Sequence, residues 1–299
     1  MNKHILVDRI ALAMASLLTG KRKFFSKSLV AHSFDEHFFQ IDLRVPELIQ
    51  EAQYEIKAKT FAGEIDPAVK VVQWLGYDYP TIIYHHGSNE RPFDFSDDAK
   101  NTFYQIFMRW PRRIPANLIL IRAPFHNGKF RHYLEKMTEL NNFMAMLAVS
   151  VRVTEWIVRQ FRRRSQAAII VTGLSLGGWV TNLHRAYYNS AQAYIPIMAG
   201  AKLADVFITS NYRKLSGKNV FYEPEKLRSK LNFFEKFRKV TTSNLYPLLA
   251  RHDQYIEYYL QKPAYNGFPL RTIDRGHITG TLSPGLCREH ILEVLQMHS

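Results

Sequence analysis

The stretch from Gln166 to Asn182, which reads QAAIIVTGLSLGGWVTN, limits the possible folds of this chain more than any other segment. Its apolar run, Ala167 to Val171, is short, rich in β-branched side chains and without alternation of apolar and polar residues. Such a run is typical of a strand that is covered on both faces, as in a parallel sheet. A helix-like pattern follows it. We therefore predict a buried strand that turns sharply into a helix, with Ser175 at the turn.

Small residues surround the serine at this turn. Gly173 and Gly177 leave room where the chain folds back, so that Ser175 in a strained conformation can lift its hydroxyl above the sheet. Gly178 would let the following helix pack closely. The start of that helix directs backbone N–H groups and a positive dipole end toward Ser175, and Leu176 N–H is the first candidate to stabilise an oxyanion there. The alternative is a glycine-rich turn whose serine only caps the helix.

Apolar runs and helical patterns alternate along the rest of the chain. Further buried strands are predicted at residues 81–84, 117–122, 193–198, 245–250 and 270–273. Long helical patterns are present at residues 133–164 and 285–297. Because strands and helices alternate, we expect an α/β fold with a mostly parallel sheet and helices on both faces.

The region before residue 83 follows a different pattern. Extended pieces at residues 38–45, 54–61 and 69–75, separated by turn residues, predict an antiparallel edge of the sheet. A helix is expected at about residues 97–109, between two of the predicted strands.

Length and composition fit one large domain. A chain of 299 residues with 46% hydrophobic residues can bury a single core, which suits an α/β domain over residues 34–299 with an insertion. Residues 201–240 interrupt the strand–helix order with a basic and aromatic segment, which we interpret as a cap. The lone Cys287 cannot form an intramolecular disulfide, so we expect a core position for it and a cytoplasmic protein.

The net charge of +14 indicates attraction to anions. No nucleic-acid-binding motif accompanies it, so we expect no specific nucleic acid and favour a membrane surface. The N-terminal extension, residues 1–33, carries six basic residues before position 28, and its apolar run is broken by Asp8 and Arg9. An amphipathic helix fits this segment, and residues 1–27 either make a peripheral membrane contact or pack on the domain's own surface. A signal peptide is the weaker alternative, because the charge pair interrupts its apolar region.

Two downstream residues complete a catalytic set. A nucleophilic serine needs a base to take its proton and a carboxylate to orient that base. Asp253 follows one predicted strand and His277 follows the next, so in a parallel sheet both would lie at the same edge as Ser175. Asp205, which follows the preceding predicted strand, is the alternative acid.

In this order of residues the chain resembles the α/β-hydrolase superfamily over residues 53–297. The run Gly173-Leu174-Ser175-Leu176-Gly177 is similar to its nucleophile elbow, residues 251–254 to its acid loop, and Gly276-His277 to its histidine loop. The resemblance implies a triad of Ser175, Asp253 and His277, and it implies that no cofactor is needed.

The segment His86-Gly87-Ser88 resembles the superfamily's oxyanion loop, although it lacks the further glycines of the HGGG type. The resemblance implies that the backbone N–H groups of Ser88 and Leu176 form the oxyanion hole, supported by His86 and Gly87. No Cys or carboxylate stands at ligand spacing from His85 and His86, so we expect these histidines to shape the loop and expect no metal.

The activity that the resemblance implies is that of a serine hydrolase, esterase-like or lipase-like, which cleaves a carboxylic ester through an acyl-enzyme. The basic, aromatic segments favour a small-molecule ester or acyl substrate that is amphiphilic or anionic. A thioesterase or peptidase would use the same triad. A different alternative is a catalytically idle scaffold that binds a membrane or a partner protein.

Overall fold

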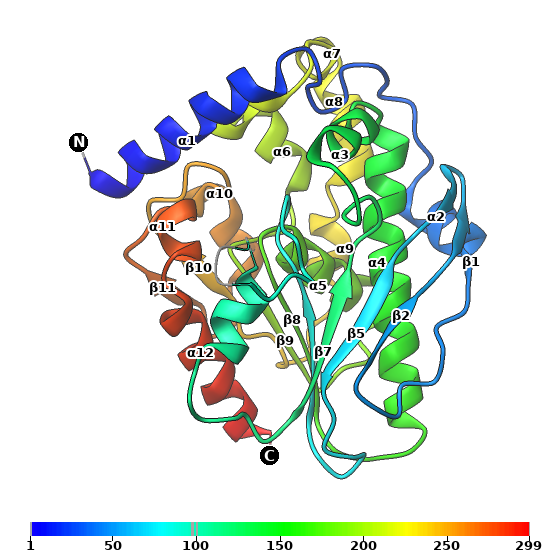
Figure 1. The fold of residues 1–299 in the computed structure, drawn as a ribbon. Coiled ribbons are helices and arrows are strands. Elements are labelled where there is room, and N and C mark those ends of the chain that lie inside the picture. The colour runs from blue at the N-terminus through cyan, green and yellow to red at the C-terminus, as the bar shows by residue number, and fades with distance from the viewer. Residues whose placement is uncertain (1, 97–98, 100, 299) are drawn as a thin grey trace.

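An eight-stranded sheet forms the centre of the protein in a computed structural model, which describes residues 2–96, 99 and 101–298 (Figure 1). In spatial order its strands are β11 (Arg271–Ile273), β10 (Leu248–Ala250), β9 (Ala193–Ile197), β8 (Ile169–Leu174), β6 (Thr81–His85), β7 (Asn117–Arg122), β5 (Ala68–Gln73) and β2 (Ala52–Glu55). All neighbours from β11 to β7 are parallel, and β5 and β2 add an antiparallel edge. The predicted mostly parallel sheet is therefore confirmed, and its predicted antiparallel edge is confirmed at β2 and β5.

Helices cover both faces of this sheet. The helices α4 (Leu140–Arg162) and α5 (Leu176–Tyr187) pack on one face, while α12 (Pro284–Met297) and the π-helix η1 (Tyr104–Met108) lie together on the other (Figure 1). Successive residues of β6 alternate between the two cores, with Ile83 in one and Ile82 and Tyr84 in the other. Apolar side chains on both faces explain why the strand runs lack alternation.

The segment at residues 38–45 differs from its prediction. Instead of a long extended piece, the chain forms α2 (Phe34–Gln40) before the two-residue strand β1 (Asp42–Leu43). A capping box starts this helix, because the Ser33 side chain accepts the N–H of Glu36 and the Glu36 carboxylate accepts the N–H of Ser33. β1 pairs with β3 (Ala58–Thr60), which pairs in turn with β4 (Gly63–Ile65), in a small separate sheet.

The helical pattern at residues 133–164 also differs, because it forms two helices, α3 (Phe130–Met137) and α4. At the junction the carbonyls of Met137 and Thr138 accept hydrogen bonds from the N–H groups of Phe25 and Lys27. The N-terminal segment therefore donates hydrogen bonds to carbonyl groups that would be paired within the helix if α3 and α4 were continuous. Of the helix expected at residues 97–109, positions 97–98 and 100 lie outside the described residues.

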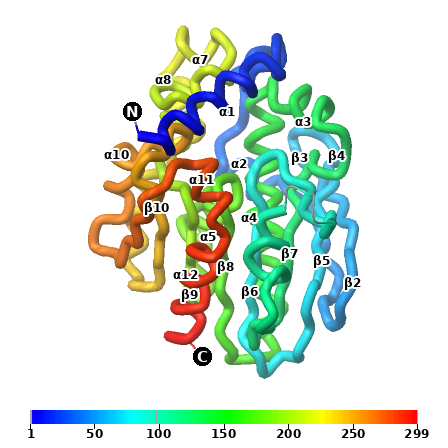
Figure 2. The backbone as a smooth tube through the Cα atoms, turned by 60° about the vertical axis from the view of Figure 1, so that its left-hand side comes forward, coloured from blue at the N-terminus to red at the C-terminus, as the bar shows by residue number. Residues whose placement is uncertain are grey.

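The N-terminal helix α1 (Lys3–Thr19) crosses the carboxyl-terminal edge of the sheet, where it packs on α11 (His277–Thr281) and η2 (Asn211–Leu215) (Figure 2). The segment between β9 and β10 contains short helices: α6 (Leu203–Ile208), η2, α7 (Asn219–Tyr222), α8 (Pro224–Leu231) and α9 (Phe234–Arg238). The remaining short helices are α10 (Tyr258–Gln261) and η3 (Lys262–Tyr265). None of the helices formed by residues 2–96, 99 and 101–298 is long and apolar enough to cross a membrane.

Candidate active site

Ser175 stands between β8 and α5 with φ 55° and ψ −108°. A positive φ is costly for a residue with a side chain, so the surrounding structure must hold this conformation. At Gly173, a Cβ would lie 2.6 Å from the carbonyl carbon of Gly177, so the turn tolerates no side chain there. The amide of Ser175 donates to Ile197 O on the neighbouring strand at 2.9 Å. The predicted strand–turn–helix around Ser175 is therefore present.

His277 and Asp253 lie at the same edge of the sheet as Ser175, after β11 and β10. The Nδ1–H of His277 donates to Asp253 Oδ2 at 2.7 Å, and both side chains are buried. The other carboxylate oxygen of Asp253 accepts the amides of Tyr255 and Ile256, both at 2.8 Å. The backbone of its own loop therefore fixes the orientation of the Asp253 carboxylate toward the imidazole.

The environment of His277 favours a basic imidazole. Burial alone would lower its pKa, but the negative charges of Asp253 and Asp8 outweigh burial and raise the pKa. The ring of Tyr255 stacks on the imidazole with centroids 4.5 Å apart and planes 15° apart. These contacts hold the ring with its other nitrogen, Nε2, free of protein partners among the described residues. Among the described residues, no hydrogen bond joins Ser175 to His277. Catalytic hydrogen bonds of this kind often tighten only when substrate binds.

The loop after β6 is held by His86. Its Nδ1 donates to the carbonyl of Gly87 at 2.6 Å, and its Nε2 accepts the amide of Ala123 at 3.0 Å. Burial, together with the neighbouring His126 and His85, lowers the pKa of His86 well below its usual value. A neutral His86 with its hydrogen on Nδ1 therefore ties the end of β6 to the end of β7.

The two amides assigned to the oxyanion hole are available. Within the described part of the chain, the N–H of Ser88 has no hydrogen-bond partner. Leu176 is the first residue of α5, and the N–H at that position has no partner within the helix. The Ser88 hydroxyl contacts Tyr133 Oη at 2.8 Å, and the amide of Gly87 donates to Glu90 Oε1 at 2.9 Å. Both amides adjoin the same sheet edge because His85 pairs with Gly173.

Other candidate residues from the sequence lie away from this set. Asp205, the alternative acid, accepts from Arg228 Nε at 2.8 Å and Asn232 Nδ2 at 3.0 Å on the following helical segment. Cys287 lies on α12 and is buried in the core. Among residues 2–96, 99 and 101–298, no group of three or more His, Cys, Asp or Glu side chains is arranged to hold a metal ion.

One functional candidate, Asp8, escaped the sequence prediction. Its carboxylate is fully buried and accepts the amides of His277 at 2.7 Å, Ile278 at 2.9 Å and Gln254 at 3.0 Å. Asp8 therefore joins the loop after β10 to the loop after β11. The sequence showed only a single acidic residue inside an apolar helical run. Its hydrogen-bond partners lie close to the other end of the chain.

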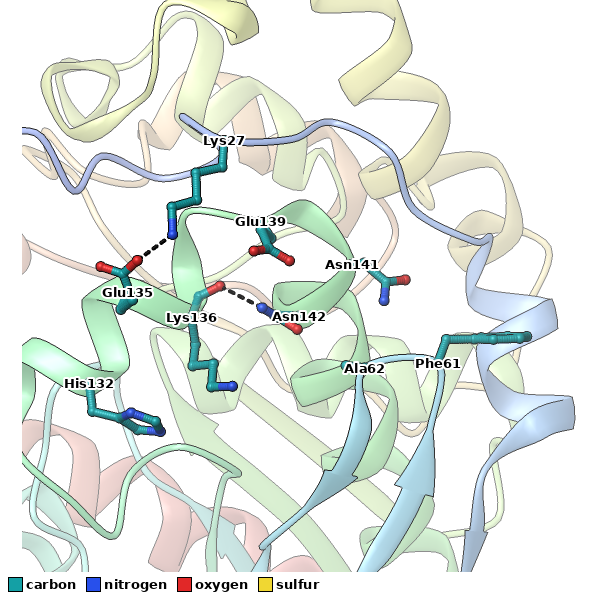
Figure 3. A pocket seen from close by; sticks show the side chains of 9 residues that line it. All are labelled: Lys27, Phe61, Ala62, His132, Glu135, Lys136, Glu139, Asn141 and Asn142. Carbon is teal, nitrogen blue, oxygen red and sulfur yellow. Dashed lines mark hydrogen bonds and ion pairs between the residues drawn. The ribbon is translucent and has the colours of Figure 1, made fainter.

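Two pockets lie near the α3 helix. One, of about 430 Å³, is lined mainly by aromatic and basic side chains together with Glu90, and it extends from Tyr133 on α3 to Asn89 on the loop after β6. The other, of about 480 Å³, lies between the α3–α4 junction and the β3–β4 turn, where Lys27 pairs with Glu135 (Figure 3). Neither pocket is lined by Ser175, Asp253 or His277.

Comparison with solved structures identifies the fold. The chain is similar to acetyl xylan esterase 1 from a Thermoanaerobacterium species, with TM-score 0.55 and 14% identity over 94% of this chain and 99% of that chain. It is also similar to an acetyl xylan esterase from Paenibacillus sp. R4, with TM-score 0.53 and 14% identity over 98% and 94% of the two chains.

A third similar structure is the acylaminoacyl peptidase of Pyrococcus horikoshii, with TM-score 0.51 and 16% identity. The match covers 81% of this chain but spans only 41% of the peptidase chain. No protein-family model and no curated protein matches the sequence. The parallel sheet, the elbow at Ser175 and these structural matches together show that the chain has the α/β-hydrolase fold.

Proposed function

We propose that this protein is a serine hydrolase that cleaves a carboxylic ester. The observation that carries the proposal is the buried hydrogen bond between His277 and Asp253, at the sheet edge where Ser175 holds a left-handed backbone conformation. A carboxylate on Nδ1 leaves Nε2 to act as the base, which is the arrangement that activates a serine hydroxyl. The fold of the similar esterases and peptidase agrees with this reading.

The reaction would proceed in two halves. Ser175 Oγ attacks the ester carbonyl while His277 Nε2 takes its proton, and the amides of Ser88 and Leu176 stabilise the negative oxygen of the tetrahedral intermediate. His277 then gives the proton to the leaving alcohol, and the acyl group remains on Ser175. Water repeats the sequence on the acyl-enzyme and releases the acid.

The pocket beside the oxyanion loop supports an ester with an apolar part and an anionic group. Phe125, Phe130 and Tyr133 supply an apolar wall. Lys129 and Arg91 supply positive charge, although Arg91 also pairs with Asp94 and the acidic Glu90 lines the same pocket. Tyr133 links the pocket to the site, because its hydroxyl contacts Ser88. A thioester or peptide would use the same residues. We favour the ester because the two similar esterases match nearly their whole chains, whereas the peptidase matches over 41% of its chain.

Activity-based labelling tests the proposal. A fluorophosphonate probe should label the wild-type protein and should not label Ser175→Ala, and hydrolysis of p-nitrophenyl esters should disappear in the same variant. A series of esters with increasing acyl length would then report the size of the pocket. If the folded wild-type protein does not label, the chain is an idle scaffold. If Ser175→Ala labels equally well, another residue is the nucleophile. Either result makes the proposal wrong.

A further inference from the structure

The helix α1 presents two different faces. On its inner face His4, Asp8 and Leu12 are buried against the body of the protein. Its outer face is a row of apolar side chains with exposed fractions between 41% and 82%, which we call the α1 stripe: Leu6, Ile10, Met14, Leu17 and Leu18. These positions recur at three and four residues, so they form one continuous line along the helix.

Packing within the chain does not explain the α1 stripe. The inner face already holds α1 in place through the hydrogen bond of Ser16 Oγ to Lys214 O at 3.1 Å and that of His4 Nδ1 with Thr279 Oγ1 at 2.9 Å. Single exposed apolar residues are ordinary, but a continuous exposed row on one helix is typical of a surface that binds a partner.

The charges around the α1 stripe indicate which partner. Lys3 and Lys21 stand at its two ends, and both are exposed. The one acidic residue before position 28, Asp8, is turned inward. Exposed basic side chains also flank α1 on η2: Arg213 and Lys214. An apolar row with a basic border is the pattern of a helix that lies in the interface of an anionic bilayer.

We propose that the α1 stripe docks on an anionic membrane surface. Its apolar side chains would enter the region between headgroups and acyl chains, while the flanking lysines and arginines bind lipid phosphates. A second copy of this chain fits the same face less well. Two copies docked through α1 would bring their basic borders together, in a protein that already carries a net charge of +14.

Vesicle flotation tests this proposal on the full-length protein. The wild-type protein should float with vesicles of phosphatidylcholine and phosphatidylglycerol, and should float far less with phosphatidylcholine alone or at high salt. The double variant Leu17→Glu and Leu18→Glu should lower the bound fraction by about tenfold or more, because carboxylates are repelled by the anionic headgroups. These two side chains are 82% and 76% exposed, so the fold should not suffer.

The matched control is Phe39→Glu on α2, on the other side of the molecule, where the side chain is 95% exposed (Figure 1). It should float like the wild-type protein. Equal flotation of the double variant and the wild-type protein would overturn the proposal, as would no flotation of the wild-type protein. If the wild-type protein instead sediments as a dimer that the double variant breaks, without vesicle binding, the face is an interface between copies and the membrane proposal is wrong.

The buried carboxylate of Asp8 carries a second inference, which rests on the proposed function. Asp8 accepts one amide from the acid loop and two from the histidine loop, so a single side chain sets the distance between those loops. A Cβ at Gly276 would lie 2.7 Å from Asp8 Oδ2, which shows how closely the histidine loop approaches it. We infer that Asp8 is a positioning residue for His277.

The substitution Asp8→Asn tests this inference through kinetics and pH. Its amide N–H₂ would face backbone N–H groups, so kcat should fall by about tenfold to a hundredfold with little change in KM. The titratable groups that face His277 are Asp253 on the acid loop, Asp8 on α1 and the stacked Tyr255. Removing the charge of Asp8 should lower the pKa of His277 and move the acidic limb of kcat/KM to lower pH.

A matched control and an independent readout separate the outcomes. Ser16→Ala loosens the contact of α1 with Lys214 without touching the triad loops, and it should keep the wild-type pH profile. If the wild-type protein labels with fluorophosphonate but Asp8→Asn changes neither kcat nor the acidic limb, the Asp8 inference is wrong. If the wild-type protein does not label, the proposed function is wrong, and an NMR titration of His277 still tests Asp8. An unchanged imidazole pKa in Asp8→Asn would then contradict the inference.

Discussion

Asp253 Oδ2 lies 2.7 Å from Nδ1 of His277, and the other carboxylate oxygen, Oδ1, accepts two backbone amides of its own loop. The carboxylate therefore has little freedom to turn away from the imidazole. This fixed acceptor selects the tautomer of His277 that carries its hydrogen on Nδ1, and it leaves Nε2 as the basic nitrogen.

Replacing this carboxylate should remove most of the activity. In Asp253→Asn an amide N–H₂ can face Nδ1, which favours the wrong tautomer of His277, so we expect kcat to fall by roughly 10³- to 10⁴-fold. Asp205→Asn is the matched control, because Asp205 contacts Arg228 and Asn232 instead of His277. Ester hydrolysis by the two purified variants measures the difference. A greater loss of kcat in Asp205→Asn than in Asp253→Asn would show that Asp253 is not the acid.

The activity should depend on the protonation of His277. Burial opposes the charged imidazole, yet Asp253 and Asp8 raise its pKa above the usual histidine value of about 6.5. His277 must be neutral to accept the proton of Ser175, so kcat/KM should fall as the pH drops through this raised pKa. A pH profile of the wild-type protein checks the sign. An acidic limb well below pH 6 would contradict it.

The close approach of Gly177 to β6 should make this glycine irreplaceable. A Cβ at this position would lie 2.0 Å from His85 O, and that atom is backbone that cannot move aside cheaply. We expect Gly177→Ala to destabilise the protein by about 1–3 kcal/mol or more and to abolish labelling of Ser175. Gly128→Ala is the control, since a Cβ there meets no atom within 4 Å. Urea unfolding of both variants gives the comparison.

A buried acidic residue away from the site, Glu155, should control acid stability. Burial would raise its pKa, but hydrogen bonds from His184, Ser190 and Arg159 lower the pKa to about 2. A group with a lowered pKa in the folded state stabilises the fold above its unfolded value of about 4.3, and this stabilisation is lost as the pH falls toward 2.

The variant Glu155→Gln should therefore unfold about 2 kcal/mol more easily at pH 7 and should lose less stability than the wild-type protein between pH 4.5 and 2. Glu64→Gln is the matched control, because Glu64 is exposed and pairs with the exposed Lys57. Thermal unfolding across this pH range provides the measurement. Parallel pH curves for the wild-type protein and Glu155→Gln would refute the assignment.

Local patterns allowed much of the fold to be predicted. Buried strands were recognisable as short β-branched runs, and the elbow was recognisable because Gly173 and Gly177 stand on either side of Ser175. Both signals depend on neighbours within a few residues, which the sequence displays directly. The prediction was wrong at α2, where the capping box between Ser33 and Glu36 was overlooked, and this signal is also local.

The resemblance of the sequence to the superfamily favours Asp253 as the acid, with Asp205 as the alternative. Asp205 and Asp253 both follow a predicted strand, and only the tertiary structure shows that one meets Arg228 while the other meets His277. The break between α3 and α4 was hidden for the same reason, because the carbonyls at the junction bond to residues near the N-terminus.

The sequence by itself therefore determined the sheet, the elbow and the order of the candidate residues, since each of these is encoded in short-range spacing. The tertiary structure decided what the N-terminal helix does. Asp8 appeared only as an interruption of an apolar run, yet folding places its carboxylate 2.7 Å from the amide of His277. A buried carboxylate needs donors, and those donors come from loops at the far end of the chain, where no local pattern can reveal them.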